Sequence, residues 1–223
     1  MKYFLLSIED GTIYDEKVIP ILDRHGIKGT FFLNSGLDDF VWYKEGRPVR
    51  RARLEERVAL YQNHEVGCHS LTHPHLTELS DDHIGYEVGV DKENLERIFA
   101  RSVTSFSFPF DDYDERCIAR IKAIEGFTAI LLPELEASFR FPKDPYHIKI
   151  TAMDIHNALT KFPVFLEDKD AELFTFVCHA YDFEFGDTYA ELEKLCTMVK
   201  NSGTKSIFFR DLPEVLESLH HQK

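Results

Sequence analysis

The stretch EVGCHSLTH, residues 65–73, runs from a short apolar segment directly into two histidines. His69 and His73 are four residues apart, so on one helical turn their imidazoles would face the same way and could hold one metal ion. Two histidines are only part of a catalytic zinc site, which needs a third protein ligand. The pair therefore predicts a metal site if a carboxylate from elsewhere completes it. The alternative is a solvated histidine pair without a ligand.

Short strand-like runs alternate with helix-like segments along the whole chain. The strand-like runs are 2–8, 29–33, 64–68, 103–108, 127–132, 148–153, 173–178 and 206–209. The helix-like segments are 15–26, 51–62, 80–100, 115–124, 155–162, 189–200 and 212–219. A loop is expected over 37–49 and an irregular segment over 133–147. This alternation indicates βα units and a parallel sheet; with no linker or repeat, it predicts one α/β domain over residues 1–223, a barrel or near-barrel.

Composition restricts the class of partner. The chain has 223 residues and a net charge of −13, from 39 acidic and 26 basic residues. A nucleic-acid binder needs clustered Lys and Arg, and the one basic stretch, 47–57, contains glutamates and is expected to be a solvated helix face. No apolar run approaches the roughly 18 residues of a membrane span, and no signal peptide is visible. We expect no nucleic-acid or membrane partner and a cytoplasmic location with reduced cysteines; export without a visible leader and the oligomeric state stay open.

Acidic and imidazole side chains collect at the ends of the predicted strands. Glu9 and Asp10 end the first run, His69 follows the third and His179 follows the seventh. In a parallel barrel the carboxyl ends of the strands share one rim, where the working residues of such folds lie. We therefore expect these side chains to meet at one site.

This set of residues suits metal-assisted hydrolysis. Two histidines and one carboxylate are a common catalytic zinc set that leaves a position open for water and substrate. The metal lowers the pKa of its water and polarises a carbonyl oxygen. Glu9 and Asp10 are adjacent, so one would bind the metal and the other would take the proton of the water. His179, from another strand, could face them and protonate the leaving group.

At these residues the chain resembles the polysaccharide deacetylase family, the NodB-homology group known as carbohydrate esterase family 4. The family's T-F-D-D-G motif corresponds to SIEDG at 7–11, and its H-[ST]-x-x-H motif is matched in full by HSLTH at 69–73. IKGTFF at 27–32 looks like the family's second strand. SFPF at 107–110 stands for R-x-P-[FYW], and VCH at 177–179 for the closing L-x-H. The likeness spans nearly the whole chain, and five motifs in order are far more specific than any one of them.

The resemblance implies a distorted parallel (β/α)7 barrel of the NodB type and metal-assisted removal of an acetyl group from an N- or O-acetylated sugar. It implies Asp10, His69 and His73 as metal ligands. Glu9 would be the general base and His179 the general acid. The implied cofactor is a divalent metal, zinc first, with cobalt, nickel or manganese as alternatives. The implied partner is an acetylated sugar or oligosaccharide.

Side chains beside these motifs could form walls against a sugar ring. Pro109, Phe110 and Tyr181 are the predicted substrate-binding residues. Further aromatic candidates, for which ordinary packing is the alternative, are Trp42, Tyr43 and Tyr113.

Three positions depart from the family's pattern. Glu9 stands where the family has Asp, and Ser107 replaces the Arg that pairs with the base carboxylate. The family's D-x-x-x-W stretch has no good match, and Asp154 is the nearest acidic residue. Two other functions therefore stay open beside the deacetylase: a binding or regulatory barrel with little or no turnover, and a small-molecule amidohydrolase on the same scaffold.

Overall fold

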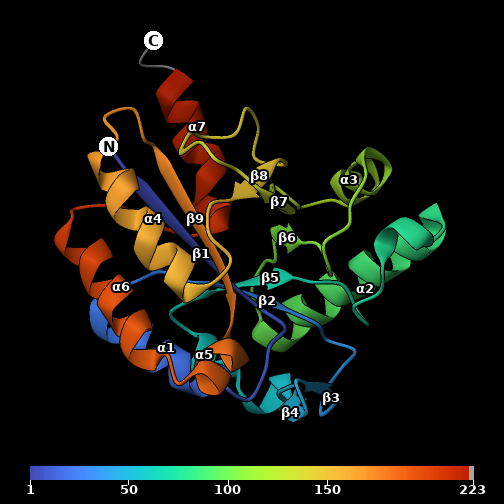
Figure 1. The fold of residues 1–223 in the computed structure, drawn as a ribbon. Coiled ribbons are helices and arrows are strands. Elements are labelled where there is room, and N and C mark those ends of the chain that lie inside the picture. The colour runs from blue at the N-terminus through green and yellow to red at the C-terminus, as the bar shows by residue number, and fades with distance from the viewer. Residues whose placement is uncertain (221–223) are drawn as a thin grey trace.

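Eight parallel strands form one curled sheet in the computed structural model, which describes residues 1–220 (Figure 1). At its centre, β1 (Tyr3–Glu9) pairs along one side with β9 (Leu173–His179). On its other side β1 pairs first with β10 (Lys205–Ile207) and then with β2 (Thr30–Leu33). From β2 the sheet continues through β5 (Glu65–Cys68), β6 (Ser105–Ser107), β7 (Ala129–Leu135) and β8 (Ile148–Ile150).

The sheet curls until its two ends meet. Beyond β8, Ala152 forms a single parallel bridge with Phe176 of β9. The amides of Thr151 and Ala152 also donate to the Thr175 carbonyl, at 2.8 and 3.1 Å. The strands β1, β2 and β5 to β9 therefore make a seven-stranded parallel barrel that is joined only briefly between β8 and β9. This confirms the predicted distorted (β/α)7 barrel.

The helices cover the outside of the sheet. They are α1 (Asp15–His25), α2 (Asp81–Phe99), α3 (Glu115–Lys122), α4 (Ile155–Glu167), α5 (Ala180–Gly186), α6 (Tyr189–Asn201) and α7 (Leu212–His220). In Figure 1, α1, α4 and α6 lie on one flank and α2 and α3 on the opposite flank. Within the described residues, no helix combines the length and apolar character needed to span a membrane.

Alternation of side chains along the strands divides the core into two layers. On β1, Phe4 packs outward under the helices, whereas Tyr3 points into the barrel. Cys68 and Cys178 belong to the outer layer, as expected for residues one position before the site histidines. The strand ends therefore present alternate side chains to the barrel mouth, where the site lies.

Three local predictions are wrong. Residues 37–49 are not a loop throughout, because β3 (Val41–Lys44) and β4 (Arg47–Arg50) form an antiparallel hairpin. Residues 51–62 are not one helix but two 3₁₀ helices, Leu54–Glu56 and Val58–Tyr61. The side chains of Arg51 and Leu54 are buried over the strand ends, so tertiary contacts override the helical periodicity of this segment. The third difference is α5, which begins directly after β9 where the pattern predicts no helix.

Candidate metal centre and active site

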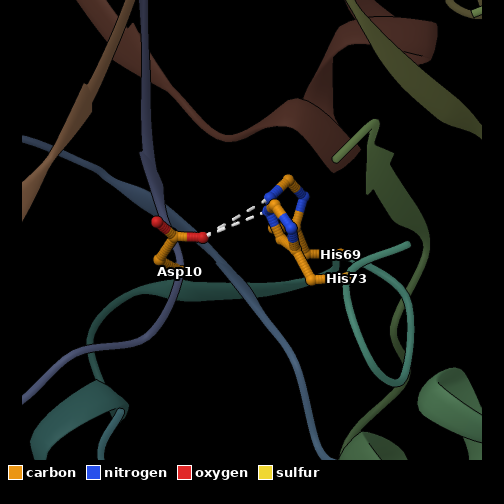
Figure 2. Close-up of side chains that lie close together, drawn as sticks. All are labelled: Asp10, His69 and His73. Atoms are coloured by element: carbon orange, nitrogen blue, oxygen red, sulfur yellow. Dashed lines mark ion pairs between the residues drawn. The ribbon is translucent and has the colours of Figure 1, made fainter. Parts of the chain in front are cut away.

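The three predicted metal ligands converge beyond the carboxyl ends of β1 and β5 (Figure 2). Asp10 Oδ1 lies 3.4 Å from His73 Nε2 and 3.8 Å from His69 Nε2. One ligand atom from each residue lies within 4.8 Å of the other two. Three donors at this spacing can share one ion.

A tight loop, not a helical turn, brings the two histidines together. Ser70 and His73 have φ of 67° and 57°, outside the right-handed helical region. The Asn34 amide nitrogen donates to the carbonyls of His69 and Ser70 at 2.6 and 2.7 Å. Asp91 of α2 accepts from the His69 amide at 3.2 Å. The predicted helical spacing is therefore wrong for the backbone, although the loop still brings the ring centroids to 4.9 Å from each other.

The donor set fits a divalent metal such as zinc. Asp10 Oδ1 is buried and makes no hydrogen bond with any of the described residues. Atoms that bind one tetrahedral zinc ion lie about 3.3–3.6 Å apart, close to the 3.4 and 3.8 Å between Asp10 Oδ1 and the two imidazoles. The Ser107 carbonyl accepts from His69 Nδ1 at 2.8 Å, so the ring presents the Nε2 lone pair to Asp10.

The charges also suit metal binding. Burial lowers the pKa of His69 well below its usual value and lowers that of His73 as well, so both rings favour the neutral form. Burial alone would raise the pKa of Asp10, but the charges of Arg51 and His179 outweigh it and hold that pKa well below its usual range. Neutral imidazoles and an ionised carboxylate are the forms of these side chains that ligate metals.

Arg51 is a site residue that the sequence reasoning missed. Its side chain is only 6% exposed, so this position is not part of the solvated face predicted for 47–57. Nη2 lies 2.9 Å from Asp10 Oδ1, in ion-pair contact but outside hydrogen-bond geometry. Nη1 donates to the Asp10 carbonyl and to Asn34 Oδ1. Arg51 thus links the strand end that carries Asp10 to the residue that holds the histidine loop.

Glu9 faces the same cleft, and two serine hydroxyls hold it. Ser107 donates to Glu9 Oε1 at 2.6 Å and Ser7 donates to the same oxygen at 3.2 Å. A neutral hydroxyl therefore contacts the carboxylate at the position where the family pattern has an arginine. Burial raises the pKa of Glu9, and the opposing effects of His179 and Ser107 do not cancel the rise. A carboxylate with a raised pKa is suited to taking up a proton.

His179 approaches these carboxylates from the end of β9. Its Nε2 lies 3.9 Å from both Glu9 Oε2 and Asp10 Oδ2. Its Nδ1 donates to Asp182 Oδ2 at 3.1 Å. Burial alone would lower the pKa of His179, but the hydrogen bond to Asp182 and the charges of Asp10 and Glu9 raise it above its usual value. The site therefore combines a carboxylate that can accept a proton with an imidazole that can carry one.

These groups open into a cleft with a volume of about 660 Å³. Of the aromatic candidates, Trp42, Phe110 and Tyr181 line it. The Tyr181 hydroxyl donates to Asp10 Oδ2 at 3.1 Å, and the Trp42 ring meets the Tyr181 ring edge to face. Phe110 stands on the other wall against His73, with ring centroids 4.5 Å apart. The cleft is thus flanked by aromatic side chains on two sides.

Several sequence candidates do not line this cleft. Pro109 is buried and is not among the residues that line it. Tyr43 and Tyr113 do not line it either; the Tyr113 hydroxyl donates to Glu134 at 2.6 Å. Asp154 caps α4 by accepting from the Asn157 amide at 2.8 Å. The acidic residue that contacts the His179 ring at Nδ1 is Asp182, one helical turn further along the chain.

Comparison with known sequences agrees with this arrangement. The family model described as polysaccharide deacetylase matches residues 1–128, more than half of the chain. The chain belongs to the polysaccharide deacetylase family. A curated relative of this family member, the uncharacterized protein YlxY of Bacillus subtilis, is 30% identical over 119 residues. The match covers 53% of this chain and 34% of the relative, so the chain spans about a third of that protein's length.

Solved structures agree on the fold of this polysaccharide deacetylase family member. The Xyl-CE4 domain of a multidomain xylanase from the hindgut metagenome of Trinervitermes trinervoides has a TM-score of 0.67 at 18% identity, covering 97% of this chain and 91% of that one. A CE4 family pseudoenzyme from Bacillus anthracis has a TM-score of 0.64 at 18% identity, covering 95% and 65%. The peptidoglycan deacetylase PdaC of Bacillus subtilis has a TM-score of 0.64 at 16% identity, covering 99% and 94%. At such identities the likeness establishes the barrel and not the activity.

Proposed function

We propose that this protein is a divalent-metal-dependent hydrolase that removes acetyl groups from an N- or O-acetylated carbohydrate. The observation that carries the proposal is the convergence of Asp10, His69 and His73 in one cleft that Glu9 and His179 also face. Family membership supports a carbohydrate substrate, and the aromatic walls of the cleft offer apolar surfaces that suit sugar rings. Phe110 and Tyr181 are the residues we propose to contact the substrate.

Asp10, His69 and His73 would hold the metal, with zinc as the first candidate. When bound, such an ion supplies a Lewis acid that polarises the acetyl carbonyl and activates water. The protein's own residues then handle the protons. Glu9, held by two serine hydroxyls, takes a proton from the attacking water. His179, with Nε2 directed toward the same carboxylates, gives a proton to the departing amine or alcohol.

The proposal is tested by measuring metal content and acetate release together. Purified protein should contain about one zinc per chain and should release acetate from N-acetylglucosamine oligomers or acetylated xylan. His69→Ala should abolish both, whereas Glu9→Gln should keep the metal and lose acetate release. His156→Ala is a matched control, because His156 is exposed on α4. A protein that binds no divalent metal under any condition would contradict the proposal.

A second candidate, a binding or regulatory barrel with weak or no turnover, is favoured by one feature. Glu9 is held by hydroxyls and lacks the cationic partner that the family pattern gives to the base. The similar fold described as a CE4 family pseudoenzyme is compatible with such a role. Zinc binding without acetate release from any acetylated sugar would favour this candidate. Hydrolysis of a small cyclic amide to the corresponding carboxylate and amine would instead favour an amidohydrolase.

A further inference from the structure

His179, the proposed general acid, is held by residues that lie outside the five motifs. His179 ends β9, and α5 begins with the next residue. Asp182, in the first turn of α5, therefore lies beside the histidine ring. Its Oδ2 accepts from His179 Nδ1 at 3.1 Å, and its Oδ1 accepts from Lys44 Nζ at 2.6 Å. Lys44 comes from β3, so the network joins the hairpin, α5 and the end of β9.

We infer that Asp182 is the positioning residue of His179, and that Lys44 determines which way Asp182 faces. The inference rests on the proposed function, in which His179 is the general acid. A carboxylate on Nδ1 turns the ring so that Nε2 points into the cleft, and it keeps the Nδ1 hydrogen in place. The carboxylate on Nδ1 is supplied from α5 by Asp182, whereas Asp154 caps α4.

Lys44 orients the Asp182 carboxylate more than it stabilises it electrostatically. The side chains of Lys44 and Asp182 are 39% and 40% exposed, so solvent screens much of their Coulomb energy. Lys44 Nζ also lies 4.8 Å from the centre of the Tyr181 ring, and Trp42 on the same strand packs against that ring. These contacts hold the ammonium group over Asp182 Oδ1, which leaves Oδ2 for the histidine.

This arrangement makes a specific prediction for the amide variant Asp182→Asn. Lys44 can only donate, so it would draw the amide oxygen to itself and turn the amide NH₂ toward His179. The His179 Nδ1 atom would then have to accept, and it could not carry the hydrogen that the acid form of the ring requires. Replacing Lys44 as well frees the amide to turn its oxygen back to Nδ1.

The kinetic test compares Asp182→Asn, Lys44→Met and the double variant, with Asp154→Asn as a matched control at an exposed helix cap. We expect Asp182→Asn to lower kcat about 100-fold or more with KM nearly unchanged. Adding Lys44→Met should restore kcat at least several-fold, although Lys44→Met alone should lower it. Bound zinc should stay at the wild-type level in all four. An Asp182→Asn enzyme with wild-type kcat, or one that Lys44→Met impairs further, would overturn the inference.

A second readout does not depend on activity. The ring nitrogen that carries the hydrogen in neutral His179 is measured by ¹⁵N NMR, with the His179→Gln spectrum identifying its signals. We expect the Nδ1–H form in the wild type, loss of this form in Asp182→Asn and its return in the double variant. Retention of the Nδ1–H form in Asp182→Asn overturns the inference. If the wild type binds zinc but releases no acetate, the proposed function fails, while these spectra still decide the role of Asp182.

Discussion

At the scale of single residues, the unusual feature of the site is that hydroxyls hold Glu9, the proposed base. A charged guanidinium would form a stronger bond to Glu9 than the neutral Ser107 hydroxyl does. The hydroxyl nonetheless holds Glu9 Oε1 at 2.6 Å, and the other carboxylate oxygen, Oε2, lies 3.9 Å from His179 Nε2. Ser107 therefore supplies orientation in place of charge.

We predict that Ser107→Ala lowers kcat about tenfold, because a lost hydrogen bond to a charged group is worth on the order of 1.5 kcal/mol. Ser7→Ala should have a smaller effect, because its bond to Glu9 is longer, 3.2 Å against 2.6 Å. Acetate release with parallel metal analysis measures both. Equal effects of the two variants, or a loss of metal in either, would contradict this assignment.

The buried ion pair of Arg51 with Asp10 gives a second prediction. Removing one partner of such a pair costs about 3–5 kcal/mol of unfolding free energy, since it leaves a buried charge alone. Arg51→Ala should therefore be strongly destabilised in the absence of metal. Added zinc should stabilise this variant more than the wild type, because the ion compensates the Asp10 charge that Arg51 otherwise meets.

Urea unfolding with and without zinc checks this expectation. Arg53→Ala serves as the control, because the Arg53 side chain is 56% exposed and pairs with Asp39 at the surface. If Arg51→Ala lowers the free energy of unfolding no more than Arg53→Ala does, the buried ion pair contributes little to stability.

At the scale of elements, the β3–β4 hairpin brings three side chains to the surroundings of the site. It delivers Trp42 to the cleft wall, Lys44 to Asp182 and, at its end, Arg51 to Asp10. The sequence feature that indicates this hairpin is Gly46, which has φ of 76° and lies in the turn between two strand-like runs. That feature could have placed Arg51 at the end of a strand, although it does not show that this end meets Asp10.

The contact of α1 with the segment before β5 contains a carboxyl group that is buried next to a phenol. Asp15 accepts from the Tyr61 hydroxyl at 2.8 Å, and burial raises the pKa of Asp15 from 3.8 to about 7. A carboxyl whose pKa is higher in the folded state binds its proton more tightly there. Its contribution to stability is therefore greatest below pH 4 and is lost as the pH rises toward 7.

Asp15→Asn should remove this dependence. We expect the variant to match the wild type near pH 4 and to exceed it at pH 8 by up to roughly 4 kcal/mol. Chemical unfolding across this pH range measures the difference. Glu16→Gln, at the neighbouring exposed position, should keep the wild-type profile. If the unfolding free energy of Asp15→Asn depends on pH as that of the wild type does, Asp15 is ionised in the folded protein.

Glycine positions within the elements give an opposed pair of predictions. A Cβ on Gly67 of β5 would lie 2.5 Å from the Phe32 ring, which fills the barrel. Gly67→Ala should therefore cost about 1–3 kcal/mol through overpacking. A Cβ on Gly89 of α2 meets nothing within 4 Å, so Gly89→Ala should stabilise the protein by about 0.5–1 kcal/mol. Thermal unfolding of the two variants should show shifts of opposite sign.

At the scale of the whole molecule, the site joins parts of the barrel that are far apart in the chain. Asp10 extends from β1, and the histidine loop extends from β5, with β2 between them. A metal ion bound by Asp10 and the histidine loop together would stabilise the whole barrel against unfolding, because it binds only when both strand ends are in place.

Zinc at one hundred times its dissociation constant should stabilise the fold by about 2.7 kcal/mol. For a domain of this size, that corresponds to a rise in Tm of about 5–10 °C. A chelator should reverse the shift, and His69→Ala should not respond. A zinc-induced shift of the same size in His69→Ala would place the stabilising ion elsewhere.

The sequence by itself determined the strands, most helices, the parallel barrel and the choice of Asp10, His69 and His73 as the proposed ligand set. These follow from periodicity within short segments and from the rule that parallel strands present their carboxyl ends at one rim. The confirmed elements include β1, β5 and β9, which position the proposed site residues Asp10, His69 and His179.

Only the tertiary structure decided how those residues are held. Arg51 reaches Asp10 across 41 positions, Ser107 reaches Glu9 across 98, and Lys44 reaches Asp182 across 138. The loop with positive φ at Ser70 and His73 likewise depends on Asn34 and α2. Local patterns encode the direction of a side chain relative to its own strand or helix. They do not encode which distant partner the folded barrel brings to it, and those partners set the charge and orientation of the site.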